Sequence, residues 1–438
     1  MSVFEPLDVI HLDLEPGVPT PPPGERDAFV VLWWRGLALA HLELTRAELD
    51  NAPILAGAIS EALAPAIGAR LFDTGFTQQP PSRVPAATEA APPLADLLGL
   101  RSPLERLGAL DAGSRAVEPS DASVIICTRG RPHDLARALE ALRRAEPAPG
   151  EIVVVDNEPA DPGAREVVER FGDAVYVPER TPGLSVARNT GIRAASGRVI
   201  AFVDDDTAVH EHWLGHLLRG LEEPRVLAVT GLVLPAQLET RAQVVFETAM
   251  GGASRGHRRI DFGQEFFEPQ TGFGVPVWAI GAGANMAFRR EAFDLVGLFD
   301  ERLGAGATGC SEDSELWYRI LAAGGQCRYV PDSVVHHWHR RDMGALRRQA
   351  HDYMRGHVAA LFVQYANHGH RGNLRRALFT VPKHLVFNRA LKELALEPSE
   401  RTGTLAAEAR GYLAGLLEWR LALPSRRSTR RSTAPTAS

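Results

Sequence analysis

Short apolar runs alternate with segments of helical pattern through the middle of the chain. The runs at residues 124–127, 152–155 and 199–203 are of the kind that strands buried on both faces of a sheet require. Segments such as 133–144 have the period of a helix with one apolar face. Strand, helix and strand in this order predict right-handed crossovers and a mostly parallel sheet. We therefore predict an α/β fold, with helices on both faces of the sheet, over residues 121–342.

A different pattern occupies the first part of the chain. Residues 29–34 and 37–44 alternate in the manner of β-strands around a short turn, which predicts a hairpin. A helical pattern follows at 54–67, so this part is expected to form a small α+β module. Trp33 and Trp34 are neighbours on the predicted strand and point to opposite faces, so we expect at least one of them to be packed in a core or a domain interface.

A linker and a helical region flank the α/β part. Residues 78–119 are rich in Pro and Ala with one helical patch near 94–110, which predicts a linker with a docking helix. The last residues combine Arg with Ser, Thr and Pro, a composition typical of disorder. The predicted division is an α+β module over 1–75, the linker over 76–120, the α/β domain over 121–342, a C-terminal helical region over 343–422 and a disordered basic tail over 423–438.

The overall composition narrows the class of protein. The chain has 438 residues, 45% of them apolar, and a formal net charge of -6, which gives no reason to expect nucleic-acid binding. Its three cysteines include no CxxC pair, so neither a disulfide framework nor a zinc site is predicted. The acidic N-terminus does not resemble a signal peptide, and no apolar run approaches the roughly 18 residues of a membrane span. We expect a cytoplasmic protein, with contact at the inner face of the membrane left open.

Three consecutive carboxylates follow the strand predicted at 199–203. Asp204, Asp205 and Asp206 would repel one another and lose hydration at the end of a buried strand. Hard divalent cations with oxygen ligands compensate such a cluster and keep sites open for water and for substrate phosphates, so a divalent cation is the expected cofactor. The competing interpretation is a solvated acidic turn that caps the next helix.

Further polar residues are expected at the same edge of the sheet. Thr128, Arg129 and Asp156 follow the ends of two other predicted strands. Ligands of such sheets gather at the carboxyl ends of the strands. The small residues Gly283 and Ala284 would let a ligand approach the backbone there.

A second acidic pair and two histidines lie farther along the chain. Ser311 has the character of a helix N-cap, and Glu312 and Asp313 in the first turn would stabilise the helix dipole whatever the function. His337 and His339 share one face of a predicted strand, where they are either metal ligands or half-exposed strand residues.

Six motifs in their order along the chain resemble those of family 2 glycosyltransferases with the GT-A fold. They are Val-Ile-Ile-Cys-Thr-Arg, Val-Val-Val-Asp-Asn, Gly-Leu-Ser-Val-Ala-Arg-Asn-Thr-Gly, Phe-Val-Asp-Asp-Asp, Gly-Ala-Asn-Met-Ala-Phe-Arg-Arg and Ser-Glu-Asp-Ser-Glu-Leu. The resemblance covers about residues 121–341 and neither the N-terminal module nor the C-terminal helices. It implies an inverting, metal-dependent enzyme that moves one sugar from a nucleoside-diphosphate sugar to an acceptor hydroxyl.

The resemblance also implies roles for individual residues. Asp204 and Asp206 match the DxD pair that binds the ribose and a Mg2+ or Mn2+ ion, and Asp205 is a substitute ligand. Asp313 matches the general base, with Glu312 assisting, and either His337 or His339 matches a further metal ligand of some relatives. The residues expected to bind the rest of the nucleotide sugar are Thr128, Arg129, Asp156, Arg188, Asn189, Gly283, Ala284 and Asn285.

Two other functions remain open at this point. A sugar-nucleotide nucleotidyltransferase shares the sheet type and the metal dependence, and a catalytically silent GT-A binding or scaffold protein shares the fold. The Gln/Arg-x-x-Arg-Trp motif of processive polysaccharide synthases is not apparent, which favours transfer of a single sugar. The expected partners are the donor and a glycan, lipid-linked or small-molecule acceptor of cell-envelope, exopolysaccharide or secondary-metabolite assembly. Basic positions in the C-terminal helices are either a solvated face or a peripheral membrane contact, and no nucleic acid is expected.

Overall fold

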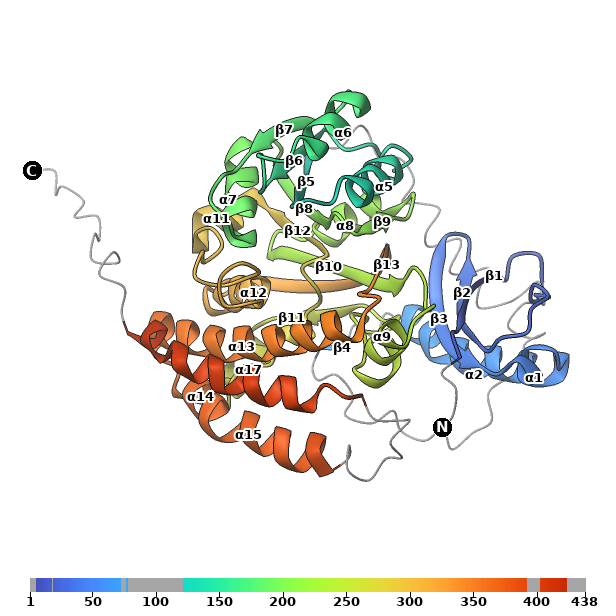
Figure 1. Cartoon of the computed structure of the whole chain (residues 1–438). Coiled ribbons are helices and arrows are strands. Elements are labelled where there is room, and N and C mark those ends of the chain that lie inside the picture. Colours follow the sequence, from blue (N-terminus) through green and yellow to red (C-terminus); the bar gives the residue numbers. More distant parts are fainter. Residues whose placement is uncertain (1–4, 18, 72–75, 78–120, 392–401, 424–438) are drawn as a thin grey trace, which may run out of the picture.

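The structure is a computed structural model that describes residues 5–17, 19–71, 76–77, 121–391 and 402–423 (Figure 1). The docking helix predicted near 94–110 and nearly all of the predicted basic tail lie outside the described residues.

A mixed sheet of ten strands forms the centre of the molecule. Nine strands follow one another across the sheet, and the tenth, β9 (Thr207–Val209), pairs with β13 outside this order. The nine strands, in spatial order, are β4 (Phe76–Thr77), β11 (Ile260–Phe262), β13 (Gln326–His337), β10 (Val226–Pro235), β12 (Asn285–Arg289), β8 (Val199–Asp204), β5 (Ala122–Thr128), β6 (Glu151–Asp156) and β7 (Val175–Pro178).

Only one half of this sheet is parallel throughout. Strands β8, β5, β6 and β7 run parallel, as the strand–helix–strand pattern predicts. Strand β12 is antiparallel to both β8 and β10, and β11 is antiparallel to β13. The second half is mixed, because it also contains the parallel pairs β10–β13 and β4–β11. The chain returns to the edge at which β10 ends before it forms β12, so β12 has to run in the opposite direction.

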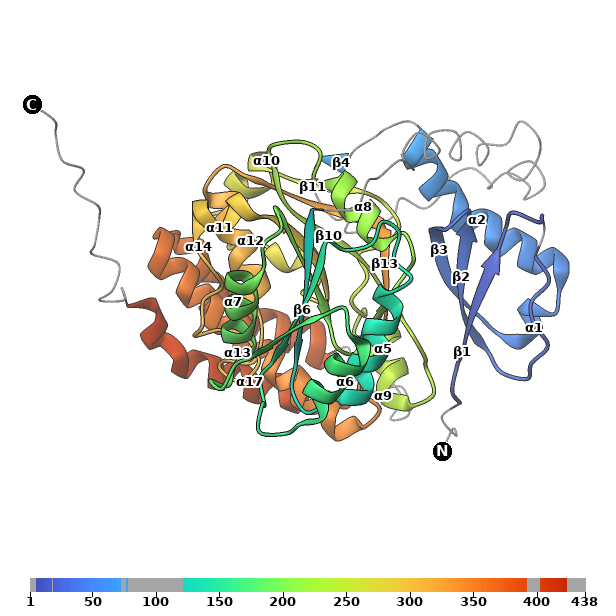
Figure 2. The ribbon, with the colours of Figure 1, turned by 90° about the horizontal axis from the view of Figure 1, so that it is seen from above.

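Helices cover both faces of the sheet, which confirms the predicted α/β class (Figure 2). Their apolar sides form one buried cluster on each face. One face carries α5 (Pro132–Leu142), α6 (Gly163–Phe171) and α8 (Trp213–Gly220), and the other carries α7 (Leu184–Ala194), α11 (Arg290–Val296) and α12 (Glu312–Ala322).

The N-terminal module has its own three-stranded sheet. Strand β1 (Asp8–Asp13) is parallel to β2 (Ala28–Trp34), which forms the predicted hairpin with β3 (Leu37–Leu44). The helices α1 (Arg46–Leu49) and α2 (Ala52–Leu71) follow. Trp34 is buried in the module's core, whereas the half-buried Trp33 stacks on His210 of the central domain at 5.0 Å between ring centroids.

The stretch 251–274 is rich in glycine and mixed in charge, a pattern that predicts a loop from sequence, but in the structure it contains regular elements. It includes β11, α10 (Gln264–Phe267) and a 3-10 helix at Glu268–Gln270. Phe262, Phe266 and Phe267 from this stretch are buried against the sheet. The prediction of a loop is wrong for this part, because burial of three aromatic side chains outweighs the local glycine content.

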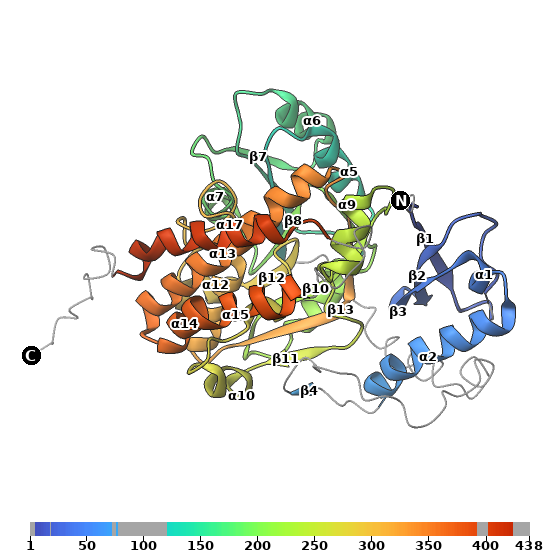
Figure 3. The same ribbon diagram turned by 60° about the horizontal axis from the view of Figure 1, so that its bottom comes forward.

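Helices occupy most of the described chain after the sheet, as predicted (Figure 3). Helix α13 (Met343–His368) packs against α12 and against α17 (Leu405–Leu417). The other helical elements that the structure describes after α13 are α14 (Arg371–Arg375), a π-helix at Arg376–Thr380, α15 (Val381–Lys383), a π-helix at His384–Ala390 and a 3-10 helix at Glu418–Ala422. Among the helices of the described residues, none combines the length and the apolar character that crossing a membrane requires.

Candidate active site

The predicted strand ends meet at one edge of the sheet. Thr128 at the end of β5 is the register partner of Asp156 at the end of β6, and Cys127 pairs with Asp204 at the end of β8. The polar residues at the ends of the three strands therefore lie side by side. This juxtaposition is the one that the sequence pattern predicts for a parallel sheet.

Asp204, Asp206 and His337 form a group that could hold a metal ion. Each offers one ligand atom, and these atoms all lie within 4.8 Å of one another. His337 is the last residue of β13, and β9 pairs antiparallel with that end of the strand, which brings it to the turn that carries the two aspartates. Two carboxylate oxygens and an imidazole nitrogen fit a divalent ion such as Mn2+, which accepts both kinds of ligand.

Three cationic groups surround Asp206. His337 Nε2 lies 3.2 Å from its Oδ1, and Arg131 and Arg340 lie 3.0 and 3.4 Å from its Oδ2. Burial by itself would raise the pKa of Asp206, but the positive charges of His337, Arg340 and Arg131 outweigh it and lower the pKa. Asp206 is thus held ionised, as a metal-binding carboxylate has to be.

Asp205, the middle residue of the acidic triplet, has a different environment. It is buried and accepts hydrogen bonds from Thr128 Oγ1 at 2.8 Å and from Arg131 Nη1 at 2.9 Å. Burial raises its pKa to about 6, against the opposing charge of Arg131. Asp205 does not belong to the metal-binding group within the described residues, and its contacts hold the turn between β8 and β9 against the end of β5.

His337 is in turn held by a chain of buried side chains. Its Nδ1 lies 2.9 Å from His339 Nδ1, and His339 Nε2 lies 2.9 Å from Glu247 Oε2. Glu247 lies on the π-helix Val245–Ala249, directly after α9 (Arg241–Val244). Of the two histidines, His337 faces the aspartates and His339 supports it from behind, so the prediction of His339 as a metal ligand is not supported. Carboxylate–histidine contacts of this kind orient metal-binding imidazoles.

Arg188 connects the acidic turn to the second acidic pair. It is buried on α7, and its Nη1 donates to Glu312 Oε1 at 2.6 Å. Its Nη2 lies 3.5 Å from Asp204 Oδ1 and 3.2 Å from the carbonyl oxygen of Gly283. The charges of Glu312 and Asp204 raise the pKa of Arg188 although burial opposes them. A permanent cation therefore lies between the two acidic groups.

Asp313 lies beside this guanidinium, in the first turn of α12. A Cβ atom placed on Gly283 would lie 3.0 Å from Asp313 Oδ2 and 3.1 Å from Arg188 Nη2. Any side chain at residue 283 would therefore press on both groups, so glycine leaves them room beside the backbone. The Asp313 side chain is half-buried, and its Oδ1 accepts a hydrogen bond from the Ser314 backbone at 2.6 Å.

Glu312 is enclosed next to Asp313. Its side chain is 7% exposed, and its Oε2 has no hydrogen-bond partner within the described part of the chain. Burial raises the pKa of Glu312 to about 7, although the positive charge of Arg188 opposes this shift. Ser311 takes the N-cap position with a φ of 70° and without a side-chain cap, so the expected serine cap is wrong. The first turn is instead held by the pairing of Glu312 with Arg188.

A comparison with known protein families identifies a match for the central domain. The profile of glycosyl transferase family 2 matches residues 123–297, which include β5 to β12. The chain contains a family 2 glycosyltransferase domain.

Two relatives show the extent of the similarity. The succinoglycan biosynthesis protein ExoM of Rhizobium meliloti is 30% identical over 223 residues, which are 48% of this chain and 64% of that protein. The pre-mycofactocin glycosyltransferase of Mycobacterium tuberculosis is 29% identical over 228 residues, 51% of this chain and 44% of that protein. The chain thus spans between about two fifths and two thirds of the length of these relatives. A mannosyltransferase of Pyrobaculum calidifontis, solved with GDP-Man and Mn2+, is 18% identical with a TM-score of 0.41, covering 73% of this chain and 83% of that one.

Two predicted binding residues of the glycosyltransferase domain have packing roles instead. Asn285 is fully buried: it accepts from Trp213 Nε1 at 2.8 Å and donates to the Leu232 and Ser333 carbonyls at 3.0 and 2.9 Å. Its amide joins α8, β10 and β13, so in the structure its side chain is engaged in packing contacts rather than exposed to a donor. Its neighbour Ala284 is buried as well.

Asn189 is the second of these residues. Its amide donates to the Phe299 carbonyl and to Glu301, each at 3.0 Å, and its oxygen accepts from the Phe299 backbone at 2.9 Å. All three contacts tie α7 to the segment after α11. Asn189 therefore positions its neighbour Arg188 rather than facing the acidic turn.

The residues predicted around the nucleotide base differ in position. Asp156 is buried and accepts from Tyr176 Oη at 2.7 Å. Arg129 is exposed and lies 3.7 Å from Glu158. Thr128 and Asp156 thus lie at the site edge, whereas Arg129 extends along the surface towards Glu158.

Sequence reasoning missed several members of the candidate site. Arg131 follows β5 by only three residues, and its place beside a strand end was a signal that could have been used. Arg340 and Glu247 had no such signal, since they approach Asp206 and His339 from segments outside the six motifs. Tyr176 contacts Asp156 from the neighbouring strand β7.

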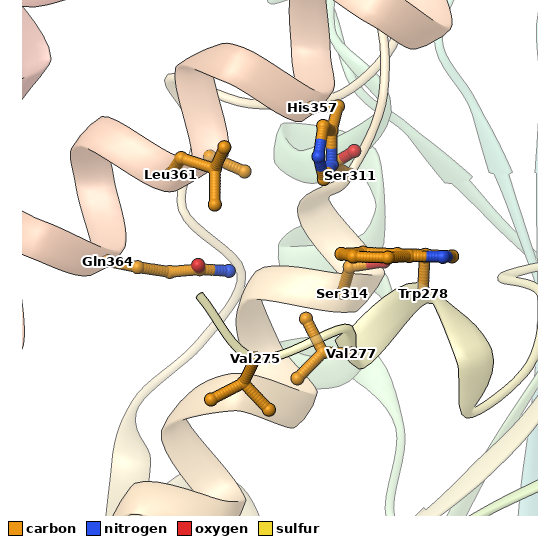
Figure 4. Close-up of a pocket in the computed structure, with 9 residues that line it drawn as sticks. Val275, Val277, Trp278, Ser311, Ser314, His357, Leu361 and Gln364 are labelled. Atoms are coloured by element: carbon orange, nitrogen blue, oxygen red, sulfur yellow. The ribbon is translucent and has the colours of Figure 1, made fainter. Parts of the chain in front are cut away.

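A small cavity lies against the helix that carries Asp313 (Figure 4). It has about 10 Å³ of space, enough for about one water molecule, so it does not hold a sugar in this structure. Its lining residues come from α12, α13 and the segment with the 3-10 helix Val277–Ala279: Val275, Val277, Trp278, Ser311, Ser314, His357, Ala360, Leu361 and Gln364.

Proposed function

We propose that this chain is an inverting, metal-dependent glycosyltransferase that transfers one sugar from a nucleoside-diphosphate sugar to an acceptor hydroxyl. One observation carries the proposal: the Asp204, Asp206 and His337 ligand atoms converge within 4.8 Å, and Arg188 links Asp204 to the helix start that bears Glu312 and Asp313. A cation site and a free carboxylate beside it are what transfer from a diphosphate donor requires.

Asp204, Asp206 and His337 would hold a Mg2+ or Mn2+ ion. When bound, the ion supplies positive charge that stabilises the departing nucleoside diphosphate. Arg131 and Arg340 lie on the other side of Asp206 and add positive charge at the same edge of the sheet. Thr128, Asp156 and the neighbouring strand ends would contact the nucleotide, and Arg188 with Gly283 would border the donor sugar.

Asp313 is proposed as the general base. Its carboxylate takes the proton of the acceptor hydroxyl while that oxygen forms a bond to the anomeric carbon. The bond from the anomeric carbon to the phosphate oxygen breaks at the same time, and its electron pair leaves with the nucleoside diphosphate. One displacement of this kind inverts the anomeric centre. Glu312 takes no proton in this scheme, and its pairing with Arg188 holds the helix start in place.

The acceptor is proposed to be a glycan, a lipid-linked sugar or a small hydroxyl compound. This range follows from the relatives, whose names include succinoglycan biosynthesis and a pre-mycofactocin glycosyltransferase. We propose that the reaction serves cell-envelope, exopolysaccharide or secondary-metabolite assembly in the cytoplasm. The N-terminal module over 1–75 and the helices over 343–422 are proposed as separate units around the catalytic domain of 121–342.

A donor panel tests this function. The purified chain would be incubated with UDP-, GDP-, dTDP- and CDP-sugars, Mn2+ and a mixture of acceptor sugars. Release of nucleoside diphosphate would be followed, together with product mass and anomeric configuration by NMR. The proposal predicts one preferred donor and a product of inverted configuration. In a parallel incubation with added pyrophosphate, conversion of the nucleoside-diphosphate sugar to nucleoside triphosphate and sugar 1-phosphate would instead indicate a nucleotidyltransferase. No turnover in either incubation would favour a scaffold protein.

A further inference from the structure

Exposed apolar side chains are concentrated on the C-terminal helices. Of the fourteen large apolar side chains that are exposed in the described residues, nine lie between positions 378 and 423. The other five are spread over the rest of the described chain, as is normal for a surface. The nine exposed apolar side chains near the C-terminus are therefore unusual, and a group of this kind often marks a binding surface.

The helical stretch 371–391 has two apolar sides. Ala377, Val381 and Leu385 recur every four residues and are buried in the cluster with α13. These residues already account for the packing of the stretch onto the protein. Five further apolar side chains of the stretch are 48–69% exposed, namely Leu378, Phe379, Val386, Phe387 and Leu391.

Helix α17 and the residues after it repeat this arrangement. Gly411 and Gly415 let α17 approach α13 closely, since a Cβ on Gly411 would lie 2.1 Å from the His351 carbonyl oxygen. Leu413 and Leu417, one turn apart on the helix, are 60% and 76% exposed. Trp419 and Leu423 beyond the helix are each 53% exposed. Figures 1 and 3 show α14, α15 and α17 together on the part of the molecule away from the N-terminal module.

The charged residues of the stretch 371–391 are all basic. Residues 371–391 contain no Asp or Glu and five Arg or Lys. Arg371, Arg375 and Lys383 are exposed, and none of them forms a salt bridge with a carboxylate of the described residues. The chain as a whole carries a net charge of -6, so this composition is local.

The carboxylates of the neighbouring α17 region are neutralised. Glu408 is buried and pairs with Arg389 at 2.7 Å, and Glu418 pairs with Arg355 at 2.5 Å. Each of the two carboxylates of the described stretch 402–423 thus has an arginine partner. The exposed apolar and basic side chains of residues 371–391, together with the exposed apolar side chains of residues 413–423, are called here the C-terminal basic surface.

We propose that the C-terminal basic surface binds the surface of a bilayer that contains anionic phospholipid. The exposed Phe379, Phe387 and Leu417 would enter the boundary between headgroups and acyl chains. Arg371, Arg375 and Lys383 would meet the lipid phosphates, and this charge complementarity is the reason to assign a bilayer rather than a second protein. Such binding is peripheral and reversible, and it holds the catalytic domain next to a membrane whether or not a donor is bound.

Flotation of the full-length chain with vesicles tests the proposal. Vesicles of phosphatidylcholine with phosphatidylglycerol are compared with vesicles of phosphatidylcholine alone, without donor or metal. We expect binding to the anionic vesicles, weakened at least tenfold by high salt or by Arg375→Glu with Lys383→Glu, because each basic residue adds several-fold to such partitioning. Phe379→Ser with Phe387→Ser should lose binding as well.

Matched controls separate this effect from general changes. Leu295 on α11 is 56% exposed, so Leu295→Ser removes an apolar side chain elsewhere, and Arg144→Glu on the α5 side makes the same charge change as Lys383→Glu. Both controls should float like the unaltered chain, and thermal melts would confirm that all variants are folded. Equal flotation of the Phe379/Phe387 variant and the unaltered chain would overturn the proposal. Failure of the unaltered chain to bind anionic vesicles would also overturn it. If the chain is instead a dimer in solution and these substitutions dissociate it, the surface binds a second copy and not a bilayer.

Discussion

Asp313 is the single residue on which the proposed chemistry depends most. Its carboxylate lies beside Arg188 and Gly283 at the start of α12. Asp313→Asn keeps the shape and removes the base, so we expect turnover to fall by about 10²–10⁴-fold, the usual contribution of a general base. Donor affinity, measured by calorimetry, should stay within about twofold. A variant with unchanged turnover would contradict the assignment of the base.

Arg188 is expected to matter for stability as well as for the site. Removing it would leave Glu312, with a side chain only 7% exposed, without its cation. Breaking a buried ion pair from one side costs about 3–5 kcal/mol, so Arg188→Met should lower the free energy of unfolding by this amount. Urea titration would measure it.

A double variant provides the control for this prediction. Arg188→Met with Glu312→Leu removes both charges, and its loss in unfolding free energy should be clearly smaller than the sum of the two single losses. Additive losses would show that the pair contributes no coupling.

The residues of the site differ in how far sequence could predict them. Asp204 and Asp206 could be placed because they directly follow a buried apolar run, and register fixes what lies at a strand end. Arg131, Arg340 and Glu247 could not, because their contacts depend on how separate segments pack in three dimensions. The same limit applies to Asn285, where a motif position was read as a binding residue although its side chain points into the core.

At the scale of elements, Asn285 joins three parts of the sheet. Its hydrogen bonds to Trp213, Leu232 and Ser333 hold α8, β10 and β13 together. Asn285→Ala would leave these buried groups without partners, and we expect a loss of about 3 kcal/mol in unfolding free energy. The affinity for the nucleotide in the folded protein should change little. A selective loss of nucleotide affinity at unchanged stability would restore the binding role.

The elements with a clear period could be predicted well. The runs at β5, β6 and β8 end in the structure within two residues of their predicted limits. The direction of β12 and the existence of β11 could not be predicted, since both depend on pairing with strands far away in sequence. Ser311 has a residue type that favours an N-cap, but its left-handed backbone at φ 70° follows from the tight turn that leads into α12.

For the molecule as a whole, histidines at the N-terminal interface predict a dependence on pH. His210 stacks on Trp33, and burial together with His212 and His11 lowers its pKa to about 4. The unfolded chain therefore binds more protons than the folded one between about pH 6.5 and pH 4, and stability should fall as the pH is lowered through this window.

Urea titrations across that window test this prediction. His210→Gln has no proton to take up, so its stability should fall less steeply with decreasing pH than that of the unaltered chain. The slope with pH is the readout, because the substitution also changes packing against Trp33. Identical slopes for the two proteins would contradict the assignment to His210.

The most direct test of the central claim is a thermal-shift measurement with UDP, GDP, dTDP and CDP, each with Mn2+ and with a chelator. A ligand that binds only the folded state stabilises it by about 2.7 kcal/mol at a hundred times its dissociation constant. Asp206→Ala and His337→Ala are measured against their own baselines without ligand. The account predicts that one diphosphate raises the midpoint only with Mn2+, and that both variants lose this shift. No shift with any of the four, or a shift that persists in Asp206→Ala, would contradict a metal-dependent donor site at Asp204, Asp206 and His337.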